Sequence, residues 1–273
     1  MFAGLISFSA LVGYWALTGG RWYVVQTPSM GQAAPVGTLL WVKPVSYGSI
    51  HVGEIITFHP PGTHETYSHR VVRINSDGSL STRGDINLAG DPWKLRAPNI
   101  EGAVAMRWWG VGWVIEAAPL LVVGGIALWI LVSWFTRPRW KAPAAMVGIA
   151  VILSLSIVIY RPLVRADLLS FVPHRHGGEA TYVSTGLLPT KLSAPGNGHI
   201  NLRDGQVGSI LSTHPIHHDV YVVHLDPRLR WWWWLVMVLV CFAPALGTVL
   251  IGRSRQEGDG PMAAGASARA IPV

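Results

Sequence analysis

The chain is poor in cysteine and in charged residues. A single cysteine, Cys241, among 273 residues excludes an intrachain disulfide and a cysteine-based zinc site. Charged residues make up 13% of the chain, whereas soluble domains carry about a quarter. This deficit argues against a fully soluble protein, and the 50% of hydrophobic residues excludes disorder over most of the length. We therefore interpret the chain as a membrane protein.

Acidic residues are fewer than basic ones, 14 against 21, and the formal net charge is +7. Such a charge suits a nucleic-acid partner, anionic lipid or a membrane topology signal. The region 19–116 holds eight basic and seven acidic residues and forms no basic patch, so nucleic-acid binding is not expected. The long apolar runs lack ionisable residues apart from border residues such as Glu116, which argues against a transporter or channel.

Four apolar segments are candidate membrane spans, at 1–18, 117–135, 142–160 and 231–251. At about 1.5 Å per helical residue, each of the last three would extend about 28–32 Å, which matches a hydrocarbon core. The first segment lacks a basic n-region and a small-residue cleavage site before Arg21, so we expect an uncleaved anchor. Tryptophans at the predicted ends are typical of the membrane interface.

Basic residues near the spans predict the topology. They lie between the second and third spans and after the fourth, at Arg137, Arg139, Lys141, Arg253, Arg255 and Arg269. The positive-inside rule assigns both regions to the cytoplasm, with 252–273 as a disordered cytoplasmic tail. Regions 19–116 and 161–230 are then extracytoplasmic.

Both extracytoplasmic regions are predicted to be rich in β-strand. Short runs of β-branched residues between Gly, Pro and Asn predict strands at 36–42, 53–58, 69–74 and 78–83, and further strands at 180–186, 207–212 and 220–225. Asn75-Ser76-Asp77-Gly78 predicts a hairpin turn. The expected fold class is a membrane protein with about four transmembrane helices, an extracytoplasmic all-β domain at 19–116 and a second small β-rich region at 161–230.

Three short motifs in 19–116 contain residue types suited to nucleophilic catalysis. They contribute a serine (Ser29), a histidine (His69) and two carboxylates (Asp85 and Asp91). A serine hydroxyl needs an adjacent base, an imidazole suits that role, and a carboxylate can fix the tautomer of the imidazole. Each residue also has an ordinary structural alternative: a turn or cap serine, an exposed strand-edge histidine, or turn carboxylates that accept backbone N–H groups.

The order of six motifs, however, resembles the signal peptidase I family. An apolar N-terminal segment is followed by P-S-M (28–30), P-V-G-T-L-L-W-V (35–42), G-E-I-I-T-F (53–58), S-H-R-V-V (68–72), T-R-G-D-I-N (82–87) with Asp91, and I-E-G-A-V (100–104). The resemblance covers about residues 5–115. It implies the catalytic domain of a membrane-anchored serine protease at 19–116.

The residue before Arg70 indicates the branch of the family. Most bacterial members look like K-R-V here and use a Ser–Lys dyad, whereas His69 resembles the endoplasmic-reticulum, archaeal and Gram-positive branch with Ser, His and Asp. The resemblance implies that Ser29 is the nucleophile and His69 the general base. It implies that Asp91 orients His69 and that Asp85 supports the site, with the reverse assignment of the two carboxylates left open.

The chain departs from the family pattern at two points. The family usually reads S-M-x-P, but here Met30 precedes Gly31-Gln32-Ala33-Ala34, and proline follows only at Pro35. The next motif commonly has Gly-Asp, where this chain has Gly37-Thr38. Both changes leave the proton-transfer groups intact and put the shape of the substrate groove in question.

The resemblance implies a serine endopeptidase of the cell membrane that removes signal peptides from exported preproteins after small residues. Its expected partners are those signal peptides, the lipid bilayer and the secretion translocon, with no cofactor and no metal. Histidines in the second β-rich region have irregular spacing for a zinc site, namely His174, His176, His214, His217 and His218. The alternative is a catalytically inactive membrane scaffold or partner-binding protein with the same module, and the role of 161–230 stays open.

Overall fold

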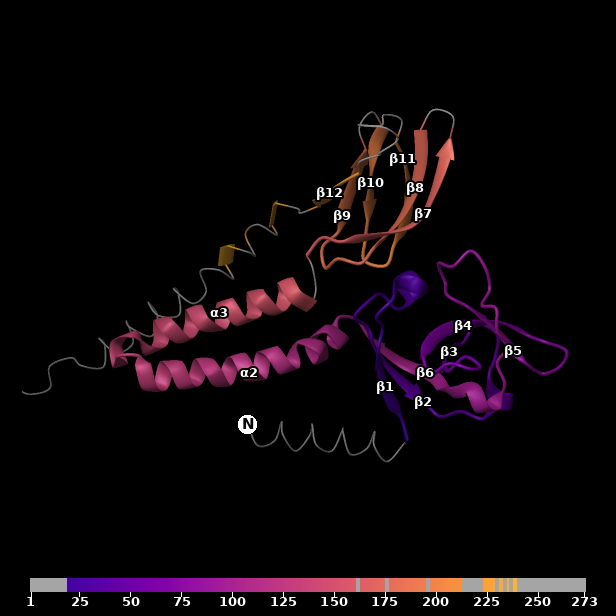
Figure 1. Cartoon of the computed structure of the whole chain (residues 1–273), viewed down its shortest axis with the longest axis horizontal. Helices are drawn as coiled ribbons and strands as arrows, with labels where there is room; N and C mark the ends of the chain where they lie inside the picture. The colour runs from indigo at the N-terminus through magenta and orange to yellow at the C-terminus, as the bar shows by residue number, and fades with distance from the viewer. Residues whose placement is uncertain are drawn as a thin grey trace, which may run out of the picture. The chain divides into compact units, whose positions relative to one another are not determined.

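The computed structural model describes residues 19–160, 163–174, 177–194, 197–212 and 223–228, together with residues 231, 232, 235, 238 and 239. Over these residues the protein is mostly β, with several antiparallel sheets and two long apolar helices (Figure 1). The chain divides into two compact units: one contains the sheets, and the other contains most of the helical hairpin.

The first part of the chain forms a six-stranded antiparallel sheet. Its strands are β1 (Arg21–Val24), β2 (Leu39–Lys43), β3 (Ile55–Phe58), β4 (Tyr67–Ile74), β5 (Leu80–Arg83) and β6 (Ile100–Trp108). The order across the sheet is β1-β2-β6-β3-β4-β5, so β6 lies between β2 and β3. Three short 3-10 segments lie in the connections, η1 (Pro28–Ala33), η2 (Tyr47–Ser49) and η3 (Ala97–Asn99).

Strands β2 to β5 coincide with the four strands predicted between residues 36 and 83, apart from a few residues at the ends. The predicted turn connects β4 to β5: the Asn75 N–H donates to the Ser79 carbonyl at 2.8 Å, and Gly78 has a φ of 77°. A positive φ costs glycine little, which explains its place in this turn. The sequence analysis did not predict β1 and β6.

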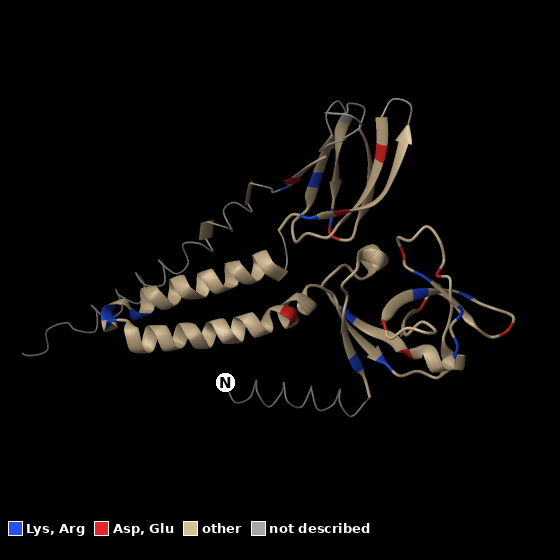
Figure 2. Ribbon diagram, viewed as in Figure 1, with Lys and Arg blue, Asp and Glu red and all other residues tan. Residues whose placement is uncertain are grey.

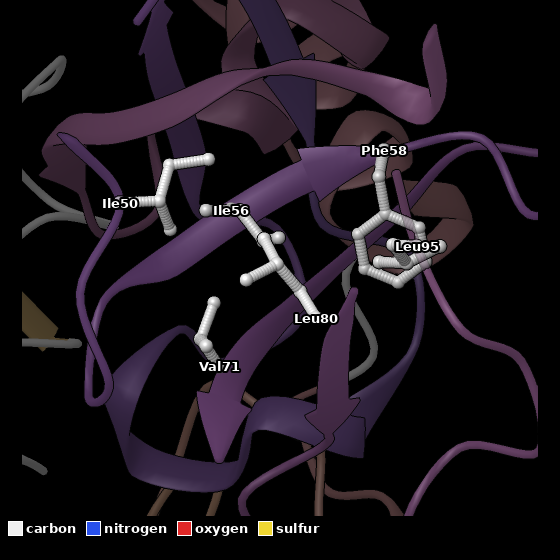
Figure 3. Close-up of a cluster of buried hydrophobic side chains, with 6 residues drawn as sticks. All are labelled: Ile50, Ile56, Phe58, Val71, Leu80 and Leu95. Atoms are coloured by element: carbon white, nitrogen blue, oxygen red, sulfur yellow. The ribbon is translucent and has the colours of Figure 1, made fainter. Parts of the chain in front are cut away.

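All four residues of strand β3 are buried. Successive side chains of a strand point to opposite faces, so β3 is buried on both faces. Ile55 packs with Met30 and Leu40 in one cluster. Ile56 and Phe58, both fully buried, belong to a second cluster that also contains Ile50, Val71, Leu80 and Leu95 (Figure 3). Burying a side chain such as Phe58 contributes about 1.5–3 kcal/mol. The two clusters fix β4 beside β3, and β4 carries His69.

The region after the helices forms two three-stranded antiparallel sheets. The strands are β7 (Ala166–His174), β8 (Gly177–Ser184), β9 (Thr190–Ala194), β10 (Asn197–Leu202), β11 (Val207–Ser212) and β12 (His224–Pro227), in the orders β10-β9-β12 and β11-β8-β7. Leu192 and Leu202 of one sheet and Ile210 of the other share one buried cluster, so the two sheets pack face to face. The predicted strand at 207–212 is β11. Of the run predicted at 220–225, residues 220–222 lie outside the described residues, and His224 and Leu225 belong to β12.

The two long helices are α2 (Val111–Phe135) and α3 (Lys141–Tyr160), separated by the 3-10 segment η4 (Pro138–Trp140). They run back along each other as a hairpin (Figure 1). Figure 2 shows basic residues at the turn between them and almost no charge along their length. Their large apolar side chains are mostly exposed, which in water would be a severe liability. Both helices are long and apolar enough to form a membrane hairpin.

The predicted fold class with about four transmembrane helices is wrong. The described part of the chain has two helices long and apolar enough to span a membrane, in an otherwise mostly β protein. A span needs about 20 continuous helical residues, and within the described ranges α2 and α3 are the helices that supply them. The segments 1–18 and 252–273 lie outside the described residues, as does most of 231–251.

Candidate active site

Ser29 lies in the short segment η1. Pro28 occupies the start of this 3-10 turn, where its fixed φ and missing N–H are no disadvantage. Gly31 has φ 51° and ψ −132°, a conformation that favours glycine and sharply redirects the chain. The Met30 side chain, 1% exposed, packs in the core cluster with Leu40. The burial of Met30 anchors the segment and leaves the Ser29 hydroxyl half-buried at its surface.

His69 lies on β4 with its ring almost completely buried. Its Nε2 is 3.0 Å from Ser29 Oγ. The rings of Phe58 and Tyr67 pack against it edge-on, with centroid distances of 6.2 and 5.8 Å. Tyr67 and His69 are two positions apart on one strand, so they share a face of the sheet. This packing restricts the His69 ring to the orientation that faces the serine.

Asp91 contacts the other nitrogen of the same ring. Its Oδ2 is 2.8 Å from His69 Nδ1, and both side chains are about 5% exposed. The Thr82 hydroxyl donates to the same Oδ2 at 2.6 Å. A carboxylate accepts hydrogen bonds, so it selects the tautomer with hydrogen on Nδ1 and leaves Nε2 free to accept the Ser29 proton.

Asp85 is directed away from this group and pairs with Arg70. The Asp85 carboxylate accepts two hydrogen bonds from the guanidinium, at 2.8 Å from Nε and 2.7 Å from Nη2. The Asp85 hydrogen bond raises the pKa of Arg70, and Arg70 also donates to the Gly53 carbonyl at 2.7 Å. The structure therefore brings Ser29, His69 and Asp91 together and separates Asp85 from them. The catalytic roles of all four residues stay predictions.

The loop that carries Asp85 nevertheless supports the serine. The Ile86 N–H donates to the Ser29 carbonyl at 3.1 Å. A Cβ atom added at Gly84 would lie 2.8 Å from that carbonyl oxygen, so only glycine fits at this approach. The bidentate Arg70–Asp85 pair holds this loop against β4.

A cleft of about 770 Å³ opens beside Ser29 and His69. Its walls come from strand β1 and the residues that follow it, from the start of β4 and from Glu116. The other lining residues are Trp22, Tyr23, Val24, Val25, Gln26, Thr27, Met30, Leu40, Glu65, Thr66, Tyr67 and Ser68. The Tyr67 hydroxyl donates to Glu65 at 2.6 Å, and this hydrogen bond raises the pKa of Tyr67. Because β1 is an edge strand of its sheet, it can pair with an extended peptide.

Two residues of this arrangement were missed by the sequence analysis. Thr82, fully buried on β5, binds Asp91, but a threonine in a strand is too common to attract notice. Its position two residues before Gly84, within T-R-G-D-I-N, is the only signal that the sequence offered. The Thr27 hydroxyl lies 3.3 Å from Ser29 Oγ, next to the proposed nucleophile.

Within the described ranges, no group of three or more His, Cys, Asp and Glu side chains could hold a metal ion. Of the histidines considered for a zinc site, His176, His214, His217 and His218 lie outside those ranges.

No model of a known protein family matches the chain, and comparison with curated proteins gives no match either. The interpretation of the site therefore depends on its geometry and on its sequence motifs.

Proposed function

We propose that the protein is a membrane-bound serine endopeptidase that removes signal peptides from exported preproteins after small residues. The observation that carries this proposal is the hydrogen-bonded series Ser29–His69–Asp91, with distances of 3.0 and 2.8 Å. The three residues come from a 3-10 turn, a strand and a loop, and Asp91 is 62 residues from Ser29 in the sequence. An inactive scaffold has no need to keep such a series next to a cleft.

In the proposed reaction, His69 Nε2 takes the proton of Ser29 as Oγ attacks the carbonyl carbon of the scissile peptide bond. The tetrahedral intermediate collapses, the C–N bond breaks, and His69 gives the proton to the leaving amine. A water molecule then loses a proton to His69 and attacks the acyl-enzyme ester. The ester bond breaks, the peptide acid leaves, and Ser29 regains its proton. Asp91 stabilises the imidazolium that forms in both halves.

The negative charge of the tetrahedral intermediate needs hydrogen-bond donors. The backbone N–H groups of η1 and the Thr27 hydroxyl, 3.3 Å from Ser29 Oγ, are the donors available beside the nucleophile. Removing one such donor from an oxyanion hole typically lowers kcat by about 10²–10³-fold. Thr27 is thus a candidate participant in addition to Ser29, His69 and Asp91.

The cleft suits an extended peptide as the substrate. Among the described strands β1 lies at the edge of its sheet, and residues 22–27 line the cleft from that strand up to Ser29. A peptide added beside β1 would therefore present successive carbonyls past the serine. The preference for small side chains next to the scissile bond is what the resemblance to the signal peptidase I family implies.

The helical hairpin supports a multi-pass location in the cell membrane, with the β regions on the extracytoplasmic side. Arg137, Arg139 and Lys141 lie at the turn between α2 and α3, and the positive-inside rule assigns such a turn to the cytoplasm. A hairpin returns the chain to the side from which it entered. The two β regions, before α2 and after α3, are then both extracytoplasmic and can meet exported substrates.

The test uses the full chain in detergent micelles with a preprotein substrate, and mass spectrometry of the new N-terminus. We expect Ser29→Ala and His69→Ala to abolish cleavage, because one removes the nucleophile and the other the base. Ser49→Ala and His51→Ala are matched controls on exposed positions of the same domain, and they should cleave within about twofold of wild type. Undiminished cleavage by Ser29→Ala, or none by wild type, would overturn the proposal.

A further inference from the structure

The turn between β10 and β11, residues 203–206, is held by three backbone hydrogen bonds. Gly205 has a φ of 72° and its N–H donates to the Ser184 carbonyl at 2.7 Å. The Gln206 N–H closes the turn on the Arg203 carbonyl at 2.8 Å, and the Gln206 carbonyl accepts from the Ser184 N–H at 3.1 Å. These bonds fix residues 203–206 to the end of β8.

This turn lies directly against the segment that carries Ser29. A Cβ atom added at Gly205 would lie 2.5 Å from the Gly31 carbonyl oxygen and 2.9 Å from the Gln32 nitrogen. In the other direction, a Cβ atom added at Gly31 would lie 3.2 Å from the Gly205 carbonyl oxygen. The two backbones are therefore in direct contact, at a distance that leaves no room for a side chain at position 205 and little room for one at position 31.

A side-chain contact beside this one holds the same turn. The Trp109 Nε1–H donates to Asp204 Oδ2 at 2.8 Å. Trp109 directly follows β6, the central strand that neighbours β2 and β3. The turn is thus linked to the sheet that carries the candidate active site at two points, the backbone of Gly31 and the indole of Trp109.

We propose that the 203–206 turn is a positioning element for Ser29, so that the second β region forms part of the active-site machinery. This inference rests on the proposed endopeptidase function. Gly31 is two residues from Ser29 and belongs to η1, the segment whose N–H groups we propose as donors to the tetrahedral intermediate. The Ile86 N–H fixes the Ser29 carbonyl, and Gly205 contacts the segment at Gly31. A displacement of about 1 Å in such a segment costs about 10²-fold in rate.

The principal variant is Gly205→Ala, studied in the full chain. The new methyl group must shift the Gly31 peptide by several tenths of an ångström, because Cβ atoms essentially never approach within 3.0 Å of another heavy atom. We expect kcat for preprotein cleavage to fall about tenfold. KM should stay within about twofold, because neither Gly31 nor Gly205 lines the cleft.

Gly198→Ala is the matched control. Gly198 also has a positive φ, 38°, and belongs to the same pair of sheets, but a Cβ atom added there meets nothing within 4 Å. It carries the same kind of backbone strain without the contact. We expect its kcat and KM to equal those of wild type within about twofold.

A second variant covers the case in which Gly205→Ala does not fold. Trp109→Phe removes the N–H that binds Asp204, and because the Trp109 side chain is 54% exposed the change leaves the core intact. We expect a threefold or greater fall in kcat with unchanged KM. If both folded variants retain the kcat of Gly198→Ala, the positioning role is refuted.

Amide hydrogen exchange separates failure of this inference from failure of the proposed function. Exchange at residues 30–34 should be at least fivefold faster in Gly205→Ala than in wild type or Gly198→Ala, whether or not the protein cleaves peptides. Equal exchange at 30–34 in all three proteins overturns the inference. If exchange at residues 30–34 is faster in Gly205→Ala but the wild-type protein cleaves no substrate, the 203–206 turn does hold the segment in place. That result overturns only the proposed endopeptidase function.

Discussion

Replacing Asp91 by asparagine removes the charge that faces the His69 ring and leaves the volume almost unchanged. The Asp91 carboxylate lies 2.8 Å from Nδ1, in a place where both side chains are about 5% exposed. Charge-assisted hydrogen bonds of this kind contribute about 1.5–3 kcal/mol. An amide that turns its NH₂ toward Nδ1 also selects the His69 tautomer with hydrogen on Nε2, which cannot accept the Ser29 proton. In a serine protease with a Ser-His-Asp triad, replacing the aspartate by asparagine lowers kcat about 10⁴-fold. We expect a fall in kcat of about 10²–10⁴-fold.

The assay is steady-state cleavage of a preprotein by the full chain in micelles. Because Asp91 does not line the cleft, KM should stay within about twofold while kcat falls. The matched variant is Asp85→Asn, which breaks the pair with Arg70. That pair is about a third exposed, so its loss should cost about 1 kcal/mol or less in stability and less than tenfold in kcat.

The comparison decides which of the two carboxylates orients His69, the question that the sequence leaves open. Thermal unfolding of both variants checks that each is folded at the assay temperature. A loss of kcat in Asp85→Asn that equals or exceeds the loss in Asp91→Asn would refute the assignment of Asp91. So would an Asp91→Asn protein whose KM rises while its kcat is unchanged.

Three further predictions concern stability and topology. Phe58→Ala empties a fully buried site and should lower the free energy of unfolding by about 3–5 kcal/mol, measured by urea titration. Hydrogen bonds from the side chain and backbone of Ser79 lower the pKa of Asp77 below its ordinary 3.8, so this contribution to the β4–β5 turn is present above pH 3.8 and is lost as the pH falls through the lowered pKa. The protection factors of the turn amides against hydrogen exchange should fall over that acidic range, and constant protection there would contradict this. With Cys241 replaced by serine, Arg139→Cys should react with a membrane-impermeant maleimide only in inside-out vesicles, and labelling of intact cells would disprove a cytoplasmic turn.

The proposed catalytic residues could be selected from the sequence because each lies in a motif whose order along the chain is distinctive. The division of labour between Asp85 and Asp91 could not, because both carboxylates belong to one loop after β5 and only the path of that loop assigns their partners. Asp85 meets Arg70 across the β4–β5 pair, whereas Asp91 returns to Thr82. Thr82 was missed for a related reason, since strand alternation shows that a side chain is buried but not what it binds.

The sequence was a better guide to strands than to spans. Strong β-branched runs between turn residues predicted β2 to β5 because alternation and turn chemistry act locally. Strand β9 was missed although its buried Thr190, Leu192 and Ala194 alternate with half-buried positions, because its apolar residues are few. The sequence predicted four spans because an apolar run specifies length and hydropathy but not helix, and among the described residues two helices, α2 and α3, are long and apolar enough to span a membrane.

The contact between Gly31 and Gly205 also sets the order of events during synthesis. Gly205 follows Ser29 by 176 residues, and the whole α2–α3 hairpin lies between them in the chain. At about 5–20 residues per second, a ribosome needs roughly 9–35 s to advance from one to the other. A nascent chain therefore carries its serine, histidine and aspartate, and the complete α2–α3 hairpin, before the serine segment can acquire this contact.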